Sequence, residues 1–403
     1  MKRKKRQIQR LKFITFICAI LFFVEICYIL NAVFFESKES LYFDGINALA
    51  RNQDYYVTVG SNNDNDLFYE KGKLSIYNSK LEKKYEKLYN VGYNSAFFGV
   101  VIDEESIVAV GSYEKEEKEH QDLVRRGLIV KYDFHGNVLF EQDFQLLDNT
   151  RFTSILCVDD GYLVTGQSVY KSTRIGSEDG GALLLKYDKE GNLVWVQTYG
   201  NNKNAVFNDL IISQDSIYVV GTGENRIGVI CKYDMNGNYI TFNHYLYTDD
   251  LGFSGIVEVG DSIYVSGSNH YGNVTDALIV EYDFDCNYQS QVIYENEGAI
   301  RYNKLIHDED EHIIAIGVLS TKKDSHNKTA DHFNYDGIIG KYNLDLKEIS
   351  VVTYGDERDD YFTDVQYVDG SYLVVGYSSY EDGSYLSKFI RYSNALKVLG
   401  VES

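Results

Sequence analysis

Short hydrophobic runs, each about five to eight residues long and bounded by Gly, Asn or Asp, recur along most of the chain. In "FNDLIISQDSIYVVG" (207–221), two runs flank a polar pair, Gln214 and Asp215. In "GVICKYDMNGNYITF" (228–242), a third run ends at Asp234 and the following "MNGN" reverses the chain into a fourth. Runs of this length are typical of strands, and Asp, Asn and Gly favour tight turns. The pattern therefore predicts an antiparallel meander of four strands.

The first half of this pattern occurs seven times and ends each time in a glycine, at intervals of 46 to 59 residues. These glycines are Gly60, Gly111, Gly166, Gly221, Gly267, Gly317 and Gly376. The second half also occurs seven times, and a tyrosine marks its register. The tyrosines are Tyr77, Tyr132, Tyr187, Tyr233, Tyr282, Tyr342 and Tyr392. Self-similarity at this period indicates a repeat architecture.

One four-stranded meander cannot bury both of its faces, so the copies must pack on one another. Four-stranded repeats of this length are the pattern of propeller blades, in which radial closure leaves only short, protected edges. The sequence thus predicts an all-β fold, a seven-bladed β-propeller of four-stranded antiparallel blades that covers residues 43–403. An open solenoid is the alternative.

The repeats alternate "F-x-x-[IL]-x-x-x-D-x-[IY]-[IY]-V-x-G" with "G-x-[IL]-[IV]-K-Y-D-x-x-G-N" and a following "W-x-x-x-Y-G". In this the chain resembles bacterial seven-bladed β-propeller repeat proteins, which are extracytoplasmic and membrane-anchored. The resemblance implies the architecture but no particular activity, because this fold carries many unrelated functions. The chain departs from more regular repeats in having a single tryptophan, Trp195.

The first 35 residues predict a membrane anchor. Residues 1–12 carry seven Lys or Arg and no acid, and residues 13–35 form an apolar stretch. As a helix, that stretch would extend roughly 34 Å, enough to cross a bilayer. Basic flanks remain cytoplasmic. We therefore expect a single-pass cell-membrane protein with a cytoplasmic N-terminus, a short tether at 36–42 and an extracellular propeller. A cleaved signal peptide is the alternative.

Glu25 lies within the expected membrane helix. An intramembrane carboxylate is costly and often functional, so Glu25 could pair with a polar group on a partner helix. The simpler explanation is that a single acid is tolerated there through protonation or proximity to the outer interface.

Charge excludes one class of partner. The chain has 39 Lys and Arg against 60 Asp and Glu, and the first 35 residues hold seven of the former and one of the latter. The remainder therefore carries a net charge of −27. A surface that binds nucleic acid needs clustered cations, so we expect no nucleic-acid partner. Cys157, Cys231 and Cys286 show no disulfide or metal-pair spacing and are expected to be ordinary thiols.

Long connections on a rigid scaffold usually carry binding. The meander places the long second-to-third connections on the same face as the links between repeats. Three of them are rich in charge: 112–126, 167–180 and 318–336. The candidate binding residues in these loops are Arg125, Arg126, Arg174, Lys322, His326 and His332.

Two acidic stretches could hold a metal. Asn63, Asp64 and Asp66 offer oxygen ligands that suit Ca²⁺, although the full EF-hand pattern is missing, and a solvated loop is the simpler explanation. "HDEDEH" (307–312) has the composition of a metal site but is expected to form a tight turn in which alternating side chains point apart. No cofactor is otherwise expected.

No catalytic motif accompanies the repeats: HExxH, P-loop, G-x-S-x-G and sialidase Asp-box patterns do not occur. We therefore expect a non-enzymatic binding or scaffold module for a protein or cell-wall partner. One alternative is a hydrolase or lyase acting on a glycan or lactone at the channel mouth. Another is a ligand-sensing domain coupled to a partner membrane protein. The 36 tyrosines could stack on sugars, but most fall in strands and are expected to pack there.

Overall fold

The computed structural model describes residues 42–402, with internal gaps. The gaps are 64–68, 90, 118–122, 170–180, 201–204, 246–250, 272–273, 296–297, 323–332, 356–357 and 381–383. The expected membrane helix at 13–35, with Glu25, lies outside the described residues. Within the described part of the chain, no helix has the length and apolar character needed to cross a bilayer.

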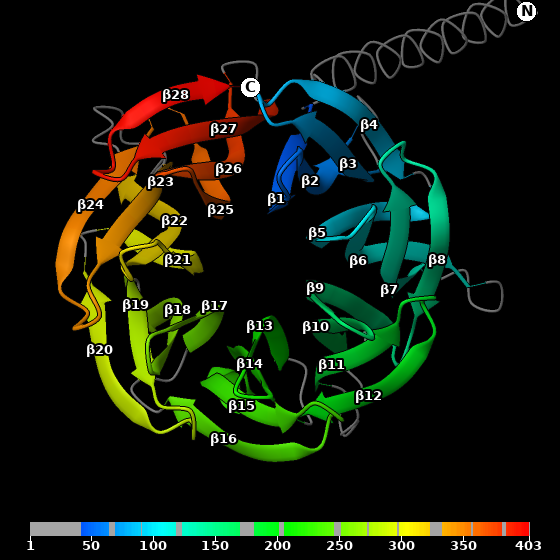
Figure 1. The fold of residues 1–403 in the computed structure, drawn as a ribbon, viewed down its shortest axis with the longest axis horizontal. Helices are drawn as coiled ribbons and strands as arrows, with labels where there is room; N and C mark the ends of the chain where they lie inside the picture. The colour runs from blue at the N-terminus through cyan, green and yellow to red at the C-terminus, as the bar shows by residue number, and fades with distance from the viewer. Residues whose placement is uncertain are drawn as a thin grey trace, which may run out of the picture. The chain divides into compact units, whose positions relative to one another are not determined.

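The described residues form strands that pair in chain order as antiparallel groups of four (Figure 1). The first strands of the groups are β1 (Asp44–Arg51), β5 (Tyr93–Asp103), β9 (Asn149–Val158), β13 (Val206–Ser213), β17 (Leu251–Val259), β21 (Ala299–His307) and β25 (Asp360–Val368). The second strands are β2 (Tyr55–Asn62), β6 (Ser106–Glu116), β10 (Gly161–Val169), β14 (Ser216–Thr222), β18 (Ser262–Tyr271), β22 (Ile313–Lys322) and β26 (Ser371–Ser379).

The third strands are β3 (Lys71–Asn78), β7 (Leu123–Asp133), β11 (Gly181–Asp188), β15 (Gly228–Asp234), β19 (Val274–Tyr282), β23 (Phe333–Tyr342) and β27 (Tyr385–Ser393). The fourth strands are β4 (Lys83–Tyr89), β8 (Val138–Phe144), β12 (Leu193–Tyr199), β16 (Tyr239–Tyr245), β20 (Tyr288–Tyr294), β24 (Glu348–Tyr354) and β28 (Val398–Glu402). A single 3₁₀ turn, η1 (Glu224–Arg226), also occurs in the described residues. The expectation of repeated four-stranded antiparallel sheets is confirmed.

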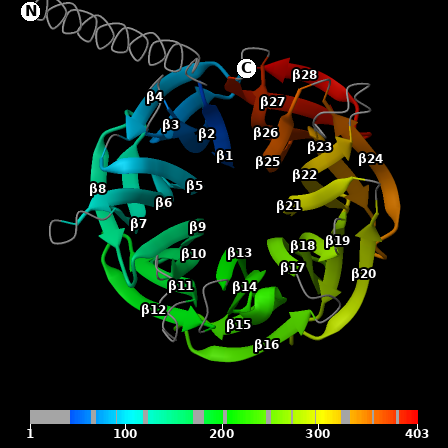
Figure 2. The same cartoon turned by 180° about the vertical axis from the view of Figure 1, so that it is seen from behind.

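Within this unit the groups follow one another around an axis, with the first strands innermost and the fourth strands at the rim, as both views show (Figures 1 and 2). The connections after the second strands share one face with the links between groups, and we call this the loop face. The connections after the first and third strands form the turn face. Two links between neighbouring groups include a parallel residue pair, Arg125 with Asn149 and Thr275 with Ala299.

The repeated glycines face a bulge in the neighbouring strand. Gly221 of β14 pairs with Phe207 of β13, and the register shifts immediately after this pair. A Cβ atom on Gly221 would lie 1.9 Å from the carbonyl oxygen of Val206. The corresponding contact recurs at the other repeat glycines, at 1.8 to 2.2 Å from a first-strand carbonyl oxygen. Only glycine permits this approach, which explains why it ends every copy of the first half-pattern.

The register tyrosines are core residues. Tyr132, Tyr342 and the equivalent tyrosines of the other groups keep at most 5% of their surface exposed. They pack between sheets, each beside apolar residues of its own group and of a neighbouring one. The expectation that strand tyrosines pack rather than bind sugar is confirmed at these positions.

The tight turns follow the expected chemistry. Gln214 and Asp215 both take positive φ, 48° and 54°, in the two-residue turn between β13 and β14. In the turn after β15, Asp234 accepts bonds from the backbone amides of Asn236 (2.9 Å) and Asn238 (2.8 Å). Gly237 in this turn has a φ of +82°, and Trp195 of the preceding group packs against it.

The glycine contact predicts a sharp difference between two substitutions. Gly221→Ala forces a methyl group into the Val206 carbonyl oxygen and should lower the free energy of unfolding by about 1–3 kcal/mol, as overpacking does. A Cβ atom on Gly400 would meet no atom within 4 Å, so Gly400→Ala should change the free energy of unfolding by less than about 0.5 kcal/mol. Urea unfolding followed through Trp195 fluorescence measures both. Equal effects would contradict the steric explanation.

Candidate functional site

The innermost strands are tied together by the side chains at their bulges. Six bulge residues donate a side-chain hydrogen bond to a backbone carbonyl of the next group. The donors are Asn47, Thr153, Asn208, Ser254, Asn303 and Thr363. Thr363 of β25 donates to Ile46 of β1 at 2.8 Å, so the last group is bonded to the first. In each of these bulges, the residue that has no partner in the strand register is the one that donates the hydrogen bond to the next group.

One bulge departs from this rule. Phe98 of β5 has no donor to offer to β9. Instead its ring lies under the guanidinium of Arg151, with 5.5 Å between the guanidinium carbon and the ring centroid. At this junction a cation over an aromatic ring therefore stands where the other junctions have a hydrogen bond.

The innermost strands enclose an axial cavity of about 230 Å³. Its lining is mainly polar and includes the bulge residues with Ser154, Asp209, Lys304 and Asp364. Lys304 of β21 reaches Asp209 of β13 at 2.7 Å between Nζ and Oδ2, past Gly255 of the intervening strand β17. A Cβ on Gly255 would lie 3.0 Å from the Lys304 Cα atom. The glycine makes room for this bridge.

The acids of the cavity are already engaged. Asp209 also accepts from Ser154 Oγ at 2.9 Å. Asp364 accepts from the backbone amides of Leu49 and Val365, both at 2.8 Å. Burial raises the pKa of Asp364, and the charge of Lys304 only partly offsets it. For Lys304, burial lowers the pKa, but the charges of Asp209 and Asp364 outweigh it and the net shift is upward. These hydrogen bonds and the ion pair therefore link innermost strands of different groups.

We expect Lys304→Met to lower the free energy of unfolding at pH 7 by about 2–3 kcal/mol. This is below the usual cost of breaking a buried pair because Lys304 keeps 31% of its side chain exposed. A carboxyl with a raised pKa costs stability above that pKa, so the deficit should shrink as pH falls from 7 towards 4. Unfolding at several pH values tests this. Lys347→Met, from an exposed pair, should change stability little at any pH.

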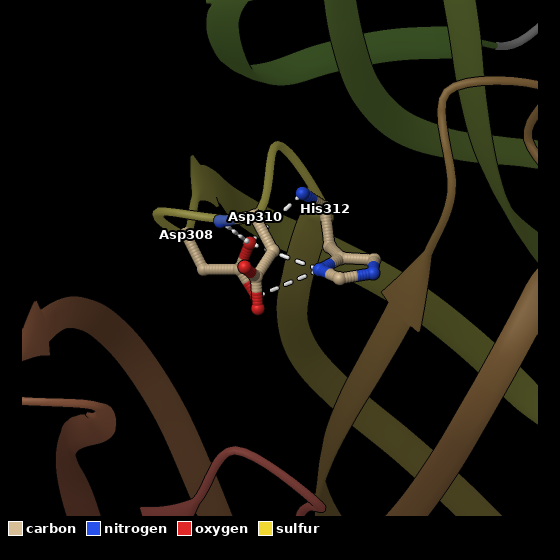
Figure 3. Close-up of side chains that lie close together, drawn as sticks. All are labelled: Asp308, Asp310 and His312. Carbon is tan, nitrogen blue, oxygen red and sulfur yellow. Dashed lines mark hydrogen bonds and ion pairs between the residues drawn. The ribbon is translucent and has the colours of Figure 1, made fainter.

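The expected turn at 307–312 contains the one group in the described residues with metal-ligand geometry. Asp308, Asp310 and His312 bring their ligand atoms within 4.8 Å of one another (Figure 3). The expectation that these side chains point apart was wrong, because strand alternation does not apply within a turn. The turn itself is confirmed, between β21 and β22.

Asp308 is nonetheless fully occupied by protein groups. Its Oδ1 accepts from the backbone amides of Asp310 and His312, and its Oδ2 accepts from Lys341 Nζ (2.9 Å) and Tyr372 OH (2.7 Å). A lysine at this distance competes with a metal ion for the carboxylate. Asp103, at the corresponding turn of the β5–β8 group, likewise accepts from a tyrosine and a lysine, Tyr162 and Lys189, and both belong to the next group. The arrangement fits a link between groups better than a metal centre.

Burial by itself raises the pKa of Asp308, but bonds from Lys341, the His312 amide and Tyr372 outweigh it and hold the pKa well below its usual range. The carboxylate thus adds stability above pH 4 that is lost as pH falls through the folded pKa. Asp308→Asn should cost about 3 kcal/mol at pH 7, and its deficit should narrow below pH 4. Asp310→Asn is the control, and its unfolding curve should match the wild type. Stabilisation of the wild type by added Zn²⁺, lost in Asp310→Asn, would contradict this assignment.

A second cavity of about 230 Å³ opens at the loop face, between the ends of β19, β21, β22, β23 and β25. Its lining residues are Thr275, Ala299, Ile300, Arg301, Val318, Tyr335 and Tyr361. Tyr335 stacks on Tyr361 at 5.4 Å between centroids, and Tyr361 stacks on Tyr377 at 4.9 Å. Tyr361 therefore contacts one aromatic ring of β23 and another of β26.

Two of the candidate loop residues are placed in ion pairs. Arg125 pairs with Glu114 at 2.9 Å, and Arg126 pairs with Asp143 at 3.0 Å. Lys322 ends β22, where its backbone pairs with Phe333. Arg174, His326 and His332 lie outside the described residues. Sequence reasoning did not single out Arg151 or Arg301, because neither lies in a long loop.

The candidate calcium ligands are only partly placed. The Asn63 side-chain oxygen accepts the backbone amide of Phe43 at 3.0 Å, which extends the pairing of β1 with β2. Asp64 and Asp66 lie outside the described residues, so the calcium site stays a prediction. The expected thiols are confirmed: Cys157, Cys231 and Cys286 are unbonded to other cysteines, and the last two are buried.

Solved structures share this arrangement of strands. Puromycin hydrolase aligns with a TM-score of 0.53 at 10% identity over 87% of this chain and 52% of its own. Hydrazine synthase of Kuenenia stuttgartiensis aligns with a TM-score of 0.51 at 8% identity, over 86% of this chain and 95% of its own. The WD40 domain of Toxoplasma gondii coronin aligns with a TM-score of 0.50 at 10% identity, over 86% of this chain and 83% of its own. WD40 repeats form propellers. The described unit is a β-propeller.

At these identities the likeness shows the fold of the propeller and nothing about its activity. The chain spans about half the length of puromycin hydrolase. No protein-family model matches the chain, and no curated protein matches it either.

Proposed function

We propose that the protein is a non-enzymatic binding module, a seven-bladed propeller whose loop face docks a protein or cell-wall partner outside the cell. The observation that carries the proposal is the cavity at the loop face, with its mixed aromatic, aliphatic and cationic lining. Pockets of this composition on a rigid scaffold are the usual form of recognition sites. The coronin WD40 domain and the other solved relatives contribute the fold to this argument, not a partner.

The engagement of the polar groups favours binding over catalysis. A hydrolase or lyase at the channel mouth would need an acid, base or nucleophile free to act on a substrate. In the axial cavity, Asp209 and Lys304 neutralise each other, and Asp364 accepts two backbone amides. No histidine or cysteine lies among the residues that line this cavity.

We further propose that residues 13–35 anchor the propeller in the cell membrane as a single pass, with residues 1–12 in the cytoplasm. The first described residues show where the chain enters the propeller. Tyr42 accepts the backbone amide of Tyr385 at 2.7 Å, and Phe43 bridges the same residue at the loop-face end of β27. The chain therefore enters the propeller at the loop face.

The proposal predicts that a partner is captured from one face only. A photo-reactive amino acid replaces Tyr69, which is 40% exposed on the loop face, or Asn236, which is exposed on the turn face. In intact cells that carry the full-length protein, illumination should yield a discrete cross-linked product at position 69 and none at position 236. Mass spectrometry of the product identifies the partner. Equal capture at the two positions, or none at either, would refute docking through the loop face.

A further inference from the structure

Arg151, on the innermost strand β9, has no counter-ion among the residues that the structure describes. Its Nε is buried and has no hydrogen-bond acceptor, and its guanidinium contacts the ring of Phe98. The charge of Arg125 repels that of Arg151, and Arg125 is itself paired with Glu114. The whole chain carries a net charge of −21, so acidic residues are plentiful. A desolvated arginine left unpaired in such a protein calls for a physical explanation.

Arg301 occupies the equivalent place on β21. Each arginine lies two residues before its bulge residue, and the carbonyl oxygen of each faces a repeat glycine, at 2.2 Å from the Gly166 Cβ position and 1.9 Å from that of Gly317. Arg301 is exposed and borders the loop-face cavity. Among the described residues, no ion pair or hydrogen bond engages its side chain. Two unpaired guanidinium groups therefore stand at one level of the innermost strands.

At the same level, the remaining innermost strands carry no charge. The residues there are Gly45, Ala96, Val206, Gly252 and Tyr361. At this register the innermost strands therefore carry two cations and no acid. Below it, the acids Asp209 and Asp364 are already engaged.

The isolation of Arg151 has a cost. Burial first, and the charge of Arg125 second, lower the pKa of its guanidinium, which shows that the surroundings disfavour the charged form. Burying an unpaired charge destabilises a fold, whereas an apolar side chain of similar size is neutral or stabilising at such a place. An anion supplied by a ligand would remove this penalty, because a carboxylate accepts two parallel bonds from the guanidinium fork.

We propose that Arg151 and Arg301 bind the carboxylates of an acidic peptide segment of a partner protein, at the loop-side ends of the innermost strands. This inference rests on the proposed function and names the chemistry of the partner. Acidic side chains of the segment pair with the two arginines. Apolar side chains between them enter the cavity beside Arg301.

The cavity lining favours a peptide over a phosphate polymer. Ile300 and Val318 contribute aliphatic groups to the lining, and Tyr335 and Tyr361 contribute aromatic rings. A phosphate chain has no apolar group to place there, whereas a peptide offers an apolar side chain next to a carboxylate. Tyrosine and arginine are also the residues that dominate the energetics of protein interfaces.

The test uses the full-length protein in detergent and a short fluorescein-labelled peptide of alternating glutamate and phenylalanine. Fluorescence anisotropy should show binding that weakens as salt rises. Arg151→Met and Arg301→Met should each weaken it about ten-fold or more, the usual effect of losing a charge-assisted pair. Arg51→Met removes an exposed arginine at the turn-face end of β1 and should leave binding unchanged.

Stability gives a second, independent readout. Arg151→Met should raise the Tm of the free protein while it weakens peptide binding, because the unpaired charge is removed together with the site. Substitution of a residue with only a structural role would lower both the Tm and the peptide affinity, or neither of them. Binding that survives in the Arg151→Met and Arg301→Met double variant would overturn the proposal.

Two further arms identify the ligand source. In one control peptide glutamine replaces glutamate (the glutamine version), and in another alanine replaces phenylalanine (the alanine version). Both should bind more weakly than the original peptide. Full retention by the alanine version, with inorganic phosphate competing equally well, would replace the peptide with a phosphate polymer. If the cross-linked product at position 69 persists in the double variant, this inference fails and the proposed function stands.

Discussion

The hydrogen bond from each bulge side chain to the next inner strand is the interaction on which the rest of this propeller depends. Each sheet is antiparallel within itself, and neighbouring sheets pack through apolar faces that impose little direction. The bonds from Asn47, Thr153, Asn208, Ser254, Asn303 and Thr363 add direction, because each side chain must meet one carbonyl oxygen. They also bond the last group to the first, and a backbone bond from Tyr385 to Tyr42 joins the same two groups, so the ends of the described unit meet without sharing a strand.

This device explains the glycine that ends the first half of every repeat. A bulge turns its extra residue towards the neighbouring sheet and pushes the preceding carbonyl oxygen towards the partner strand. At Gly221 that oxygen occupies the place where a Cβ atom would stand. The bulge and the glycine are therefore one structural feature that occupies two sequence positions. Asn208 donates the hydrogen bond to the next group, and Gly221 leaves space for the Val206 carbonyl oxygen.

The sequence was sufficient for the strands, the turns and the repeat, because these depend on local periodicity and on residues such as Asp234 and Gly237 that set turn geometry. It was not sufficient for the contacts between sheets. Asp308 and Tyr372 are 64 positions apart, and Lys304 meets Asp209 across 95 positions. Nor did a loop search find Arg151, since its significance comes from what surrounds it: a phenylalanine below and no acid beside it. Pairings of this kind depend on how the sheets are set around the axis, which no single repeat encodes.

Departures from the repeat are the most informative residues for function. A ring of similar sheets is stabilised equally at each junction, so a position that follows the rule needs no explanation beyond folding. Phe98 gives up the hydrogen bond that six equivalent residues make, and Arg151 above it forgoes a counter-ion. Both losses reduce stability, and they fall at the same junction. Natural sequences break local rules mainly where function requires it. The coincidence of two losses at one place makes the junction between β5 and β9 the part of the described unit whose chemistry is least accounted for by folding alone.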